Sequence, residues 1–219
     1  MKSIVILISG RGSNMVSLIN AAADGSLPVR VAAVLSNRPD AKGLQIAAAA
    51  GVVTRVVDHT LYSNRESFDA AMAGAIDAFS PDLVVLAGFM RILSDGFVTR
   101  YAGRLINIHP SLLPSFPGLH THQRALDEGV RIHGCTVHFV TPALDHGPIV
   151  VQAAVPVVDG DDAVTLATRV LAQEHRIYPL AVRWFAEGRL RLVDGRVVLD
   201  VPQERAFCLI APQASGGCQ

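Results

Sequence analysis

Two polar side chains near the middle of this sequence are suited to stabilising an oxyanion and moving a proton. Asn107 and His109 flank Ile108 at the end of an apolar run, and Pro110 follows at once. Residues two apart on a strand point to the same face, so we expect the amide and the imidazole to lie side by side. An amide N–H can bind a developing oxyanion, and an imidazole can donate or transfer a proton. Taken alone, His109 fits a structural histidine equally well.

A carboxylate that could assist them lies in the turn at residues 144–148, between two later apolar runs. A carboxylate close to an imidazole raises the pKa of the ring and holds its orientation. Asp145 is suited to that role, although by itself it is typical of a turn. Only closeness in space to His109 would make Asp145 part of a catalytic group.

A candidate anion site lies at residues 10–14, after the first apolar run and before a helical pattern. Glycines let the backbone approach a ligand closely, and the free N–H groups and dipole at a helix start favour an anion. Met15 stands where the dinucleotide pattern GxGxxG has its final glycine, so the segment favours a single phosphate over NAD. A tight turn with a helix cap is the simpler alternative.

Other chemically capable residues fit structural roles better. Six of the eight histidines fall between His109 and His146, which indicates a polar wall around a site. Their spacing matches no HExxH or cysteine–histidine zinc pattern, so we predict no metal site. Ser111 lies in no GxSxG motif, and Cys135 sits in a strand pattern with no base beside it.

Length and composition indicate a globular protein. The chain has 219 residues, of which 50% are hydrophobic and 17% charged, which suits one large domain or two small ones. Lys and Arg total 19, as do Asp and Glu, so the charge suggests neither nucleic acid nor a membrane as a partner. The three cysteines form no CxxC motif, and no apolar run suits a signal peptide or a membrane span. We therefore expect a cytoplasmic protein.

Short β-branched runs alternate with alanine-rich helical patterns along the first half of the chain. Such alternation predicts an α/β, Rossmann-like fold with a mostly parallel twisted sheet and helices on both faces. Sheets of this kind bind ligands beyond the carboxyl ends of their strands. The predicted strands are 4–8, 29–35, 52–57, 83–87 and 105–108, and the predicted helices are 13–23, 42–50 and 64–79.

The pattern changes after His109. Pro110, Pro114 and Pro117 exclude a regular helix or a central strand, so residues 110–121 are predicted to form a shaped loop. The later predictions are a helix at 123–128, strands at 134–140 and 149–157, a helix at 162–187 bent near Pro179, and a hairpin at 189–199. We predict a single domain over residues 1–200 and a poorly ordered tail over 201–219.

Taken together, these motifs resemble the phosphoribosylglycinamide formyltransferase family, the folate-dependent transformylases of purine synthesis. The trio Asn107, His109 and Asp145 is shared with all formyltransferases that use 10-formyltetrahydrofolate, whereas the GxGSN loop and the chain length indicate this family. The resemblance covers nearly the whole chain. The motifs that carry it are residues 8–14, 86–93, 107–114, 117–122 and 173–175.

The resemblance implies transfer of the formyl group of 10-formyltetrahydrofolate, a co-substrate, to the amine of phosphoribosylglycinamide, and it implies the formyltransferase fold. Amine attack would form a tetrahedral oxyanion, to which Asn107 and protonated His109 would donate. Asp145 would hold His109 directly or through a water. Because both substrates would be bound together, the reaction needs neither a covalent intermediate nor a metal.

The resemblance also implies where the substrates bind. The phosphate would rest on Gly12, Ser13 and Asn14, and Glu174 with Gln173 would hold the ribose and glycinamide portion. The loop after His109 would be a mobile lid, and exposed portions of the sheet leave room for a homodimer. The residues implied for the folate are Arg65 at its benzoylglutamate end, then Met90, Arg91, Ile92, Leu93, Asn107, Thr141, Leu144 and Asp145.

Several alternatives stay open beside this interpretation. Methionyl-tRNA formyltransferases share the trio but carry an additional RNA-binding domain, for which this chain has neither the length nor the basic charge. Formyltetrahydrofolate hydrolases usually have an extra N-terminal domain, whereas the first strand here is expected from residue 4. A catalytically silent binding module would share the fold, and a histidine-clustered metal hydrolase would bind zinc. Two positions depart from the common family pattern, His146 after Asp145 and Arg11 in the phosphate loop.

Overall fold

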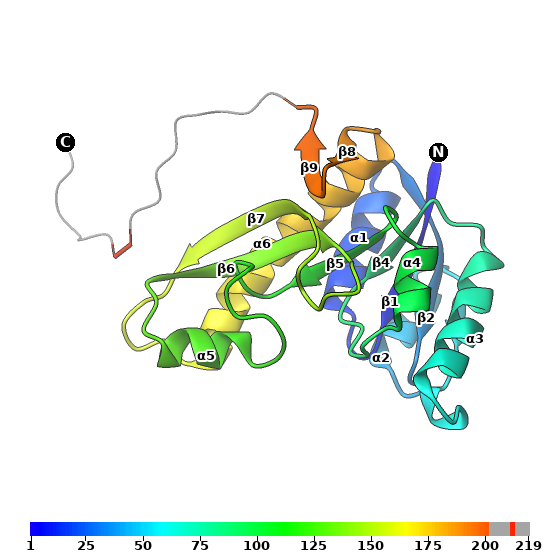
Figure 1. The fold of residues 1–219 in the computed structure, drawn as a ribbon, viewed down its shortest axis with the longest axis horizontal. Coiled ribbons are helices and arrows are strands. Elements are labelled where there is room, and N and C mark those ends of the chain that lie inside the picture. The colour runs from blue at the N-terminus through cyan, green and yellow to red at the C-terminus, as the bar shows by residue number, and fades with distance from the viewer. Residues whose placement is uncertain (202–210, 213–219) are drawn as a thin grey trace.

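A seven-stranded sheet forms the centre of the protein, with the strand order β3-β2-β1-β4-β5-β6-β7 (Figure 1). The computed structural model describes residues 1–201 and 211–212. The strands β1 to β5 pair in parallel, and β6 pairs antiparallel with both β5 and β7. The mostly parallel α/β sheet is therefore confirmed. Its strands are β1 (Lys2–Ile8), β2 (Val29–Ser36), β3 (Thr54–Val56), β4 (Leu83–Leu86), β5 (Leu105–His109), β6 (Ile132–Phe139) and β7 (Ile149–Pro156).

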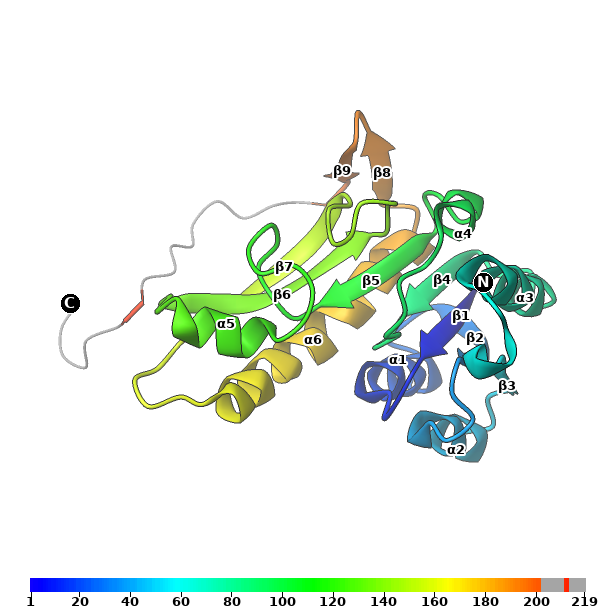
Figure 2. The same ribbon diagram turned by 60° about the horizontal axis from the view of Figure 1, so that its bottom comes forward.

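Helices cover both faces of the sheet, as Figure 2 shows. Alternate residues of β1 face opposite sides, so Ile6 joins one hydrophobic core and Leu7 the other. The first core is shared with α1 (Ser13–Ala23), α2 (Lys42–Ala49), α5 (Thr121–Asp127) and α6 (Ala163–Ala186). The second is shared with α3 (Arg65–Asp77) and α4 (Asp95–Arg100). Burial on both faces explains why β1 reads as a continuous apolar run.

The strand order reverses direction between β1 and β4. From β1 the chain passes outward to β2 and β3, and it then returns to place β4 on the other side of β1. Such a switch point leaves a crevice beyond the carboxyl ends of the two strands, where ligands bind in this class of sheet. The segment at residues 10–14 follows β1, and the segment at residues 88–93 follows β4.

Helix α6 is continuous through Pro179, where the sequence predicts a bend. Proline has no N–H, so the carbonyl of His175, four residues earlier, lacks its helical partner. The hydroxyl of Ser17 on α1 donates to that carbonyl over 2.9 Å. The buried Tyr178 hydroxyl donates to the carbonyl of Leu86 over 2.8 Å and so fixes the same turn of α6 to the end of β4.

The structure departs from the predicted elements in a few places. Helix α4 and the short 3₁₀ helix η1 (His59–Leu61) are additional to the predicted elements, and α5 begins two residues before its predicted start. The predicted hairpin forms as β8 (Leu190–Val193) and β9 (Arg196–Leu199). Its turn residues Asp194 and Gly195 have φ of 49° and 73°, which a two-residue hairpin of this type requires. Most of the predicted tail lies outside the described residues.

Candidate active site

Strand β5 places Asn107 and His109 on one face at the carboxyl edge of the sheet. Asn107 lies opposite His138 of β6, and His109 lies opposite Thr136. Residues directly opposite on paired strands share a face, so all four side chains project to the same side. His109 is buried, with 5% of its surface exposed.

The loop between β6 and β7 brings Asp145 to His109. Oδ2 of Asp145 lies 3.5 Å from Nδ1 of His109, and the two side chains are 8% and 7% exposed. Asp145 has a positive φ of 53°, and Gly147 lies so close to the carbonyl oxygen of Phe139 that a Cβ there would approach it to 1.7 Å. The loop can therefore take this path only with glycine at position 147. The closeness that would give Asp145 a catalytic role is present.

His138 orients the amide of Asn107, a role that no motif in the sequence predicts. Nδ1 of His138 lies 2.9 Å from the carbonyl oxygen of Phe139, which makes that nitrogen the donor. Nε2 is then an acceptor, and it lies 3.4 Å from Nδ2 of Asn107. Burial lowers the pKa of His138 and so favours the neutral ring that this pairing needs. One N–H of Asn107 is thereby fixed, and the other makes no hydrogen bond within the part of the chain that the structure describes.

The loop that follows β5 is anchored at its start by Thr136. The hydroxyl of Thr136 donates to the carbonyl of Ser111 over 2.6 Å and accepts the N–H of Leu113 over 3.0 Å. The amide of Gln152 on β7 donates to the carbonyl of Leu113 and to the Thr136 hydroxyl, each over 2.9 Å. These contacts fix the path of the chain as it leaves His109.

The later part of the same loop contacts the catalytic candidates. The carbonyl oxygen of Phe116 lies 3.0 Å from Nε2 of His109. The N–H of Gly118 donates to Oδ2 of Asp145 over 2.8 Å. Both ring nitrogens of His109 therefore face oxygen atoms, one from Asp145 and one from the loop. The Phe116 carbonyl therefore occupies the hydrogen-bonding direction of Nε2.

The segment between β1 and α1 has the features of an anion site. Gly12 lies at the helix start with φ of 70° and has no side chain to cap the first N–H groups, which leaves them for a ligand. Nδ2 of Asn14 donates to Oε2 of Glu174 on α6 over 2.7 Å. Oδ1 of Asn14 is buried and has no hydrogen-bond partner among the described residues, and burial raises the pKa of Glu174. The structure thus joins Glu174 to this loop, whereas the side chain of Gln173 accepts from Arg176 along the helix.

Apolar side chains are exposed in the segments that follow β4 and precede β7. Met90, Ile92 and Leu144 are each more than half exposed, and such side chains mark ligand-binding surfaces when they lie together. Three other residues are implied for the folate. Leu93 is half-buried, and the hydroxyl of Thr141 donates to the carbonyl of Ala143. The guanidinium of Arg91 stacks on Phe68, with 4.9 Å between Cζ and the ring centroid.

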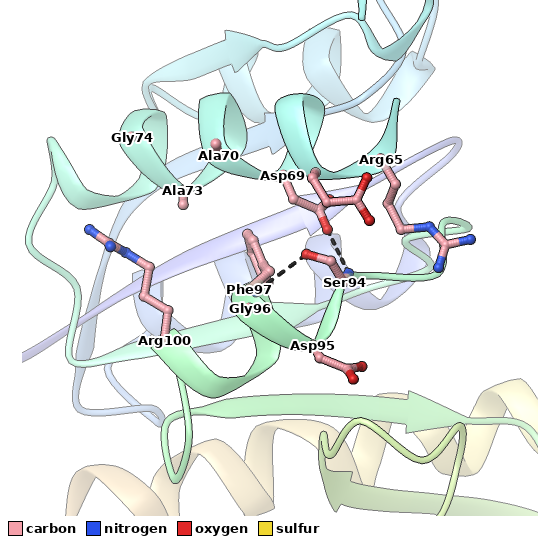
Figure 3. Close-up of a pocket in the computed structure, with 11 residues that line it drawn as sticks. Arg65, Asp69, Ala70, Ala73, Gly74, Ser94, Asp95, Gly96, Phe97 and Arg100 are labelled. Atoms are coloured by element: carbon pink, nitrogen blue, oxygen red, sulfur yellow. Dashed lines mark hydrogen bonds between the residues drawn. The ribbon is translucent and has the colours of Figure 1, made fainter. Parts of the chain in front are cut away.

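Arg65 lies at the start of α3. It lines one end of a groove of about 730 Å³ between α3 and α4 (Figure 3). The buried Asp69 in this groove accepts the N–H of Ser94 over 2.6 Å, and the Ser94 hydroxyl caps α4. The groove is lined by none of Asn107, His109 and Asp145, whose geometry defines the candidate active site.

The remaining candidates lie either in the core or at the surface. Cys135 is buried, and burial raises the pKa of its thiol to about 12, as suits a core residue. His146 is exposed, with Nδ1 3.1 Å from the carbonyl of Leu144, and Arg11 is exposed in the segment between β1 and α1. Within residues 1–201 and 211–212, no three His, Cys, Asp or Glu side chains form a group that could hold a metal ion.

A buried histidine beneath the loop predicts acid sensitivity. His133 is 1% exposed and packs edge-on against the rings of Phe116 and His122. Burial and the neighbouring His122 lower its pKa from 6.5 to about 4. As the pH falls from 6.5 to 4, His133 therefore binds a proton in the unfolded chain before it does so in the folded protein. The contribution of neutral His133 to the free energy of unfolding is complete above pH 6.5 and is lost towards pH 4.

We expect His133→Phe to remove this part of the acid destabilisation, on the order of 3 kcal/mol between neutral pH and pH 4. Urea unfolding of both proteins across that pH range measures it. The exposed His146 provides the control, because His146→Phe should leave the pH dependence unchanged. Identical pH dependence in His133→Phe and the wild type would contradict this assignment.

Comparison with known proteins agrees with the geometry. Residues 2–182 match the family described as formyl transferase. The phosphoribosylglycinamide formyltransferase of Escherichia coli K12 is 51% identical over 198 residues, which are 90% of this chain and 93% of that one. The chain belongs to the phosphoribosylglycinamide formyltransferase family. The glycinamide ribonucleotide transformylase 1 of Symbiobacterium toebii superimposes with a TM-score of 0.89 at 50% identity, covering 91% of this chain and 94% of that one.

A related formyltransferase fold serves a different reaction. The formyltetrahydrofolate deformylase of Burkholderia mallei superimposes with a TM-score of 0.83 at 30% identity, covering 90% of this chain and 69% of that one. Because similar folds serve both reactions, the acceptor of the formyl group has to be established by experiment. In the described part of the chain, no helix has the length and apolar character to cross a membrane.

Proposed function

We propose that Asn107, His109 and Asp145 catalyse formyl transfer by direct attack of the substrate amine. The enzyme transfers the formyl group of 10-formyltetrahydrofolate to the amine of 5'-phosphoribosylglycinamide, a step of purine biosynthesis. The observation that carries the proposed mechanism is the meeting of the amide, the imidazole and the carboxylate at the end of β5. The anion site after β1 opens on the same edge of the sheet.

The chemistry follows from the positions of these groups. The amine nitrogen bonds to the formyl carbon, and the formyl oxygen becomes an oxyanion that accepts the free N–H of Asn107. Collapse of this intermediate breaks the bond between the formyl carbon and N10 of the folate. The amine loses a proton and N10 gains one, and His109 transfers protons through Nε2 while Asp145 holds Nδ1.

We assign the substrates to the two sides of the switch point. The phosphate binds at Gly12, Ser13 and Asn14, and Glu174 binds the ribose and glycinamide, supported by the Asn14–Glu174 contact. The folate binds along the exposed apolar side chains that follow β4 and precede β7, with Arg65 towards its glutamate end. No metal takes part in this mechanism. We further propose a cytoplasmic location, and a homodimer that forms through exposed portions of the sheet.

The phosphate loop gives a prediction that separates binding from catalysis. The N–H of Gly43 on α2 donates to the carbonyl of Gly10 over 3.0 Å. A Cβ at Gly43 would lie 2.6 Å from Ile8 and 3.1 Å from the carbonyl oxygens of Gly10 and Arg11. We expect Gly43→Ala to displace the loop and to raise KM for the ribonucleotide about tenfold, or about 1.4 kcal/mol.

Steady-state kinetics with the ribonucleotide varied would measure this effect. Gly74→Ala is the matched control, because a Cβ at that position on α3 meets nothing within 4 Å. The control should keep its KM and gain up to about 1 kcal/mol of stability. An unchanged KM in Gly43→Ala would contradict the role given to the loop.

A spectrophotometric assay tests the proposed reaction itself. The protein is mixed with 10-formyltetrahydrofolate, with and without the ribonucleotide. We expect folate turnover only when the ribonucleotide is present. Turnover without the acceptor would identify a hydrolase, and no turnover despite binding of both ligands would identify a silent binding module.

A further inference from the structure

Ser9 joins the two segments that flank the switch point. It follows β1 directly, precedes the phosphate loop and is 7% exposed. Its backbone N–H donates to the carbonyl of Gly88 over 3.1 Å, and its hydroxyl accepts the N–H of Met90 over 2.8 Å. One residue thus holds the segment after β4 against the segment after β1.

Asn37 fixes the direction of the Ser9 hydroxyl. The hydroxyl donates to Oδ1 of Asn37 over 2.6 Å, which leaves its oxygen free to accept the Met90 N–H. Asn37 follows β2, is 3% exposed, and its carbonyl accepts the backbone N–H of His59 over 3.2 Å. The hydrogen bonds therefore run across the carboxyl ends of β4, β1 and β2. Buried polar groups joined in this way keep a single arrangement because each broken bond leaves an unpaired group.

We propose that Ser9 is a positioning residue that sets the distance between two binding segments, the ribonucleotide seat at residues 10–14 and the folate seat at residues 88–93. Asn37 fixes the direction of the Ser9 hydroxyl. The proposal rests on the substrate assignment made above. Ser9 precedes the loop that binds the phosphate, and it binds the backbone at Met90, where the folate segment begins. If one seat is displaced against the other, the amine no longer lies in position to attack the formyl carbon. A shift of about 1 Å can lower the rate about 100-fold.

The expected result of Ser9→Ala follows from this geometry. The Met90 N–H and the Asn37 carboxamide oxygen lose their shared partner, so the segment at Met90 is no longer fixed to Ser9, although the backbone bond from Ser9 to Gly88 remains. We expect kcat to fall roughly 10- to 100-fold. The Kd of each substrate measured alone should change little, because each seat is intact by itself.

A covalent adduct of the ribonucleotide with the folate measures the distance between the seats directly. Its affinity depends on both seats being correctly spaced, as for any ligand that engages two sites at once. We expect calorimetry to show that Ser9→Ala weakens binding of the adduct far more than binding of either substrate. A residue that only stabilised the fold would lower the melting temperature without this selective loss.

Ser36 offers a matched control at the end of β2. It is fully buried, and its hydroxyl donates to the carbonyl of Arg38 over 2.9 Å and accepts the Arg38 N–H over 3.0 Å. Ser36→Ala removes the same number of hydrogen bonds within one loop, and it should leave kcat and adduct affinity unchanged. Ser9→Thr keeps the hydroxyl and should restore much of the activity that Ser9→Ala loses.

Two results would overturn the proposal. One is wild-type kcat and adduct affinity in Ser9→Ala. The other is a loss of activity that Ser36→Ala reproduces in full, with adduct binding unaffected in both. Absence of formyl transfer by the wild type would instead count against the proposed function, so the two failures are distinct.

Discussion

His109→Ala should leave ribonucleotide binding nearly intact and lower kcat roughly 100- to 10,000-fold, the usual contribution of a positioned proton-transfer group. His109 lies with Nδ1 at Asp145 and Nε2 towards the loop, so its loss removes the group that moves the proton. The anion site after β1 does not include it. The loss should therefore appear in kcat and not in the Kd of the ribonucleotide.

Parallel kinetics and calorimetry on two variants check this result. His146→Ala is the control, because that exposed imidazole lies one residue from Asp145 and contacts only the carbonyl of Leu144 among the hydrogen bonds of the described residues. It should keep its kcat. Unchanged turnover in His109→Ala would remove His109 from the mechanism.

Asn107→Ala should lower kcat roughly 100- to 1,000-fold, the usual effect of removing one oxyanion donor. The Asn107 amide is directed by His138, which accepts one of its N–H groups. His138→Ala should therefore cause a smaller loss of kcat, because the donor remains but its direction is no longer fixed. Pre-steady-state kinetics of the chemical step would measure both losses.

The double variant tests whether the two residues act as a unit. Once Asn107 is absent, His138 has no amide to orient. The double variant should then lose little more activity than Asn107→Ala alone, which is the non-additivity expected of residues in contact. Fully additive losses would show that His138 acts on the reaction independently of Asn107.

Much of the fold could be predicted because its signals are local. The apolar run of β1 and the alternation of strands and helices predict the parallel sheet. Helix α4 escapes prediction because it has six residues, too few to show a helical period. Its local signals are only the cap Ser94, which accepts from Phe97, and the charges of Asp95 in the first turn and Arg100 in the last.

The site is harder to predict from the sequence because it depends on pairing between distant strands. Asn107 and His109 share a face by strand alternation alone. Asp145 reaches His109 only because β6 returns antiparallel beside β5 and the following loop turns back. His138 acquires its role through the register that sets it opposite Asn107, and no local pattern specifies that register.

The most direct test of the mechanism is a single-turnover experiment with excess enzyme and 10-formyltetrahydrofolate labelled in the formyl group. The reaction is quenched in acid at successive times, and label is counted in the ribonucleotide, in free formate and on the protein. Direct attack assisted by Asn107 and His109 predicts that all label passes to the ribonucleotide, with none on the protein at any time. Label held covalently on the protein, or released as formate in the presence of the ribonucleotide, would contradict the mechanism.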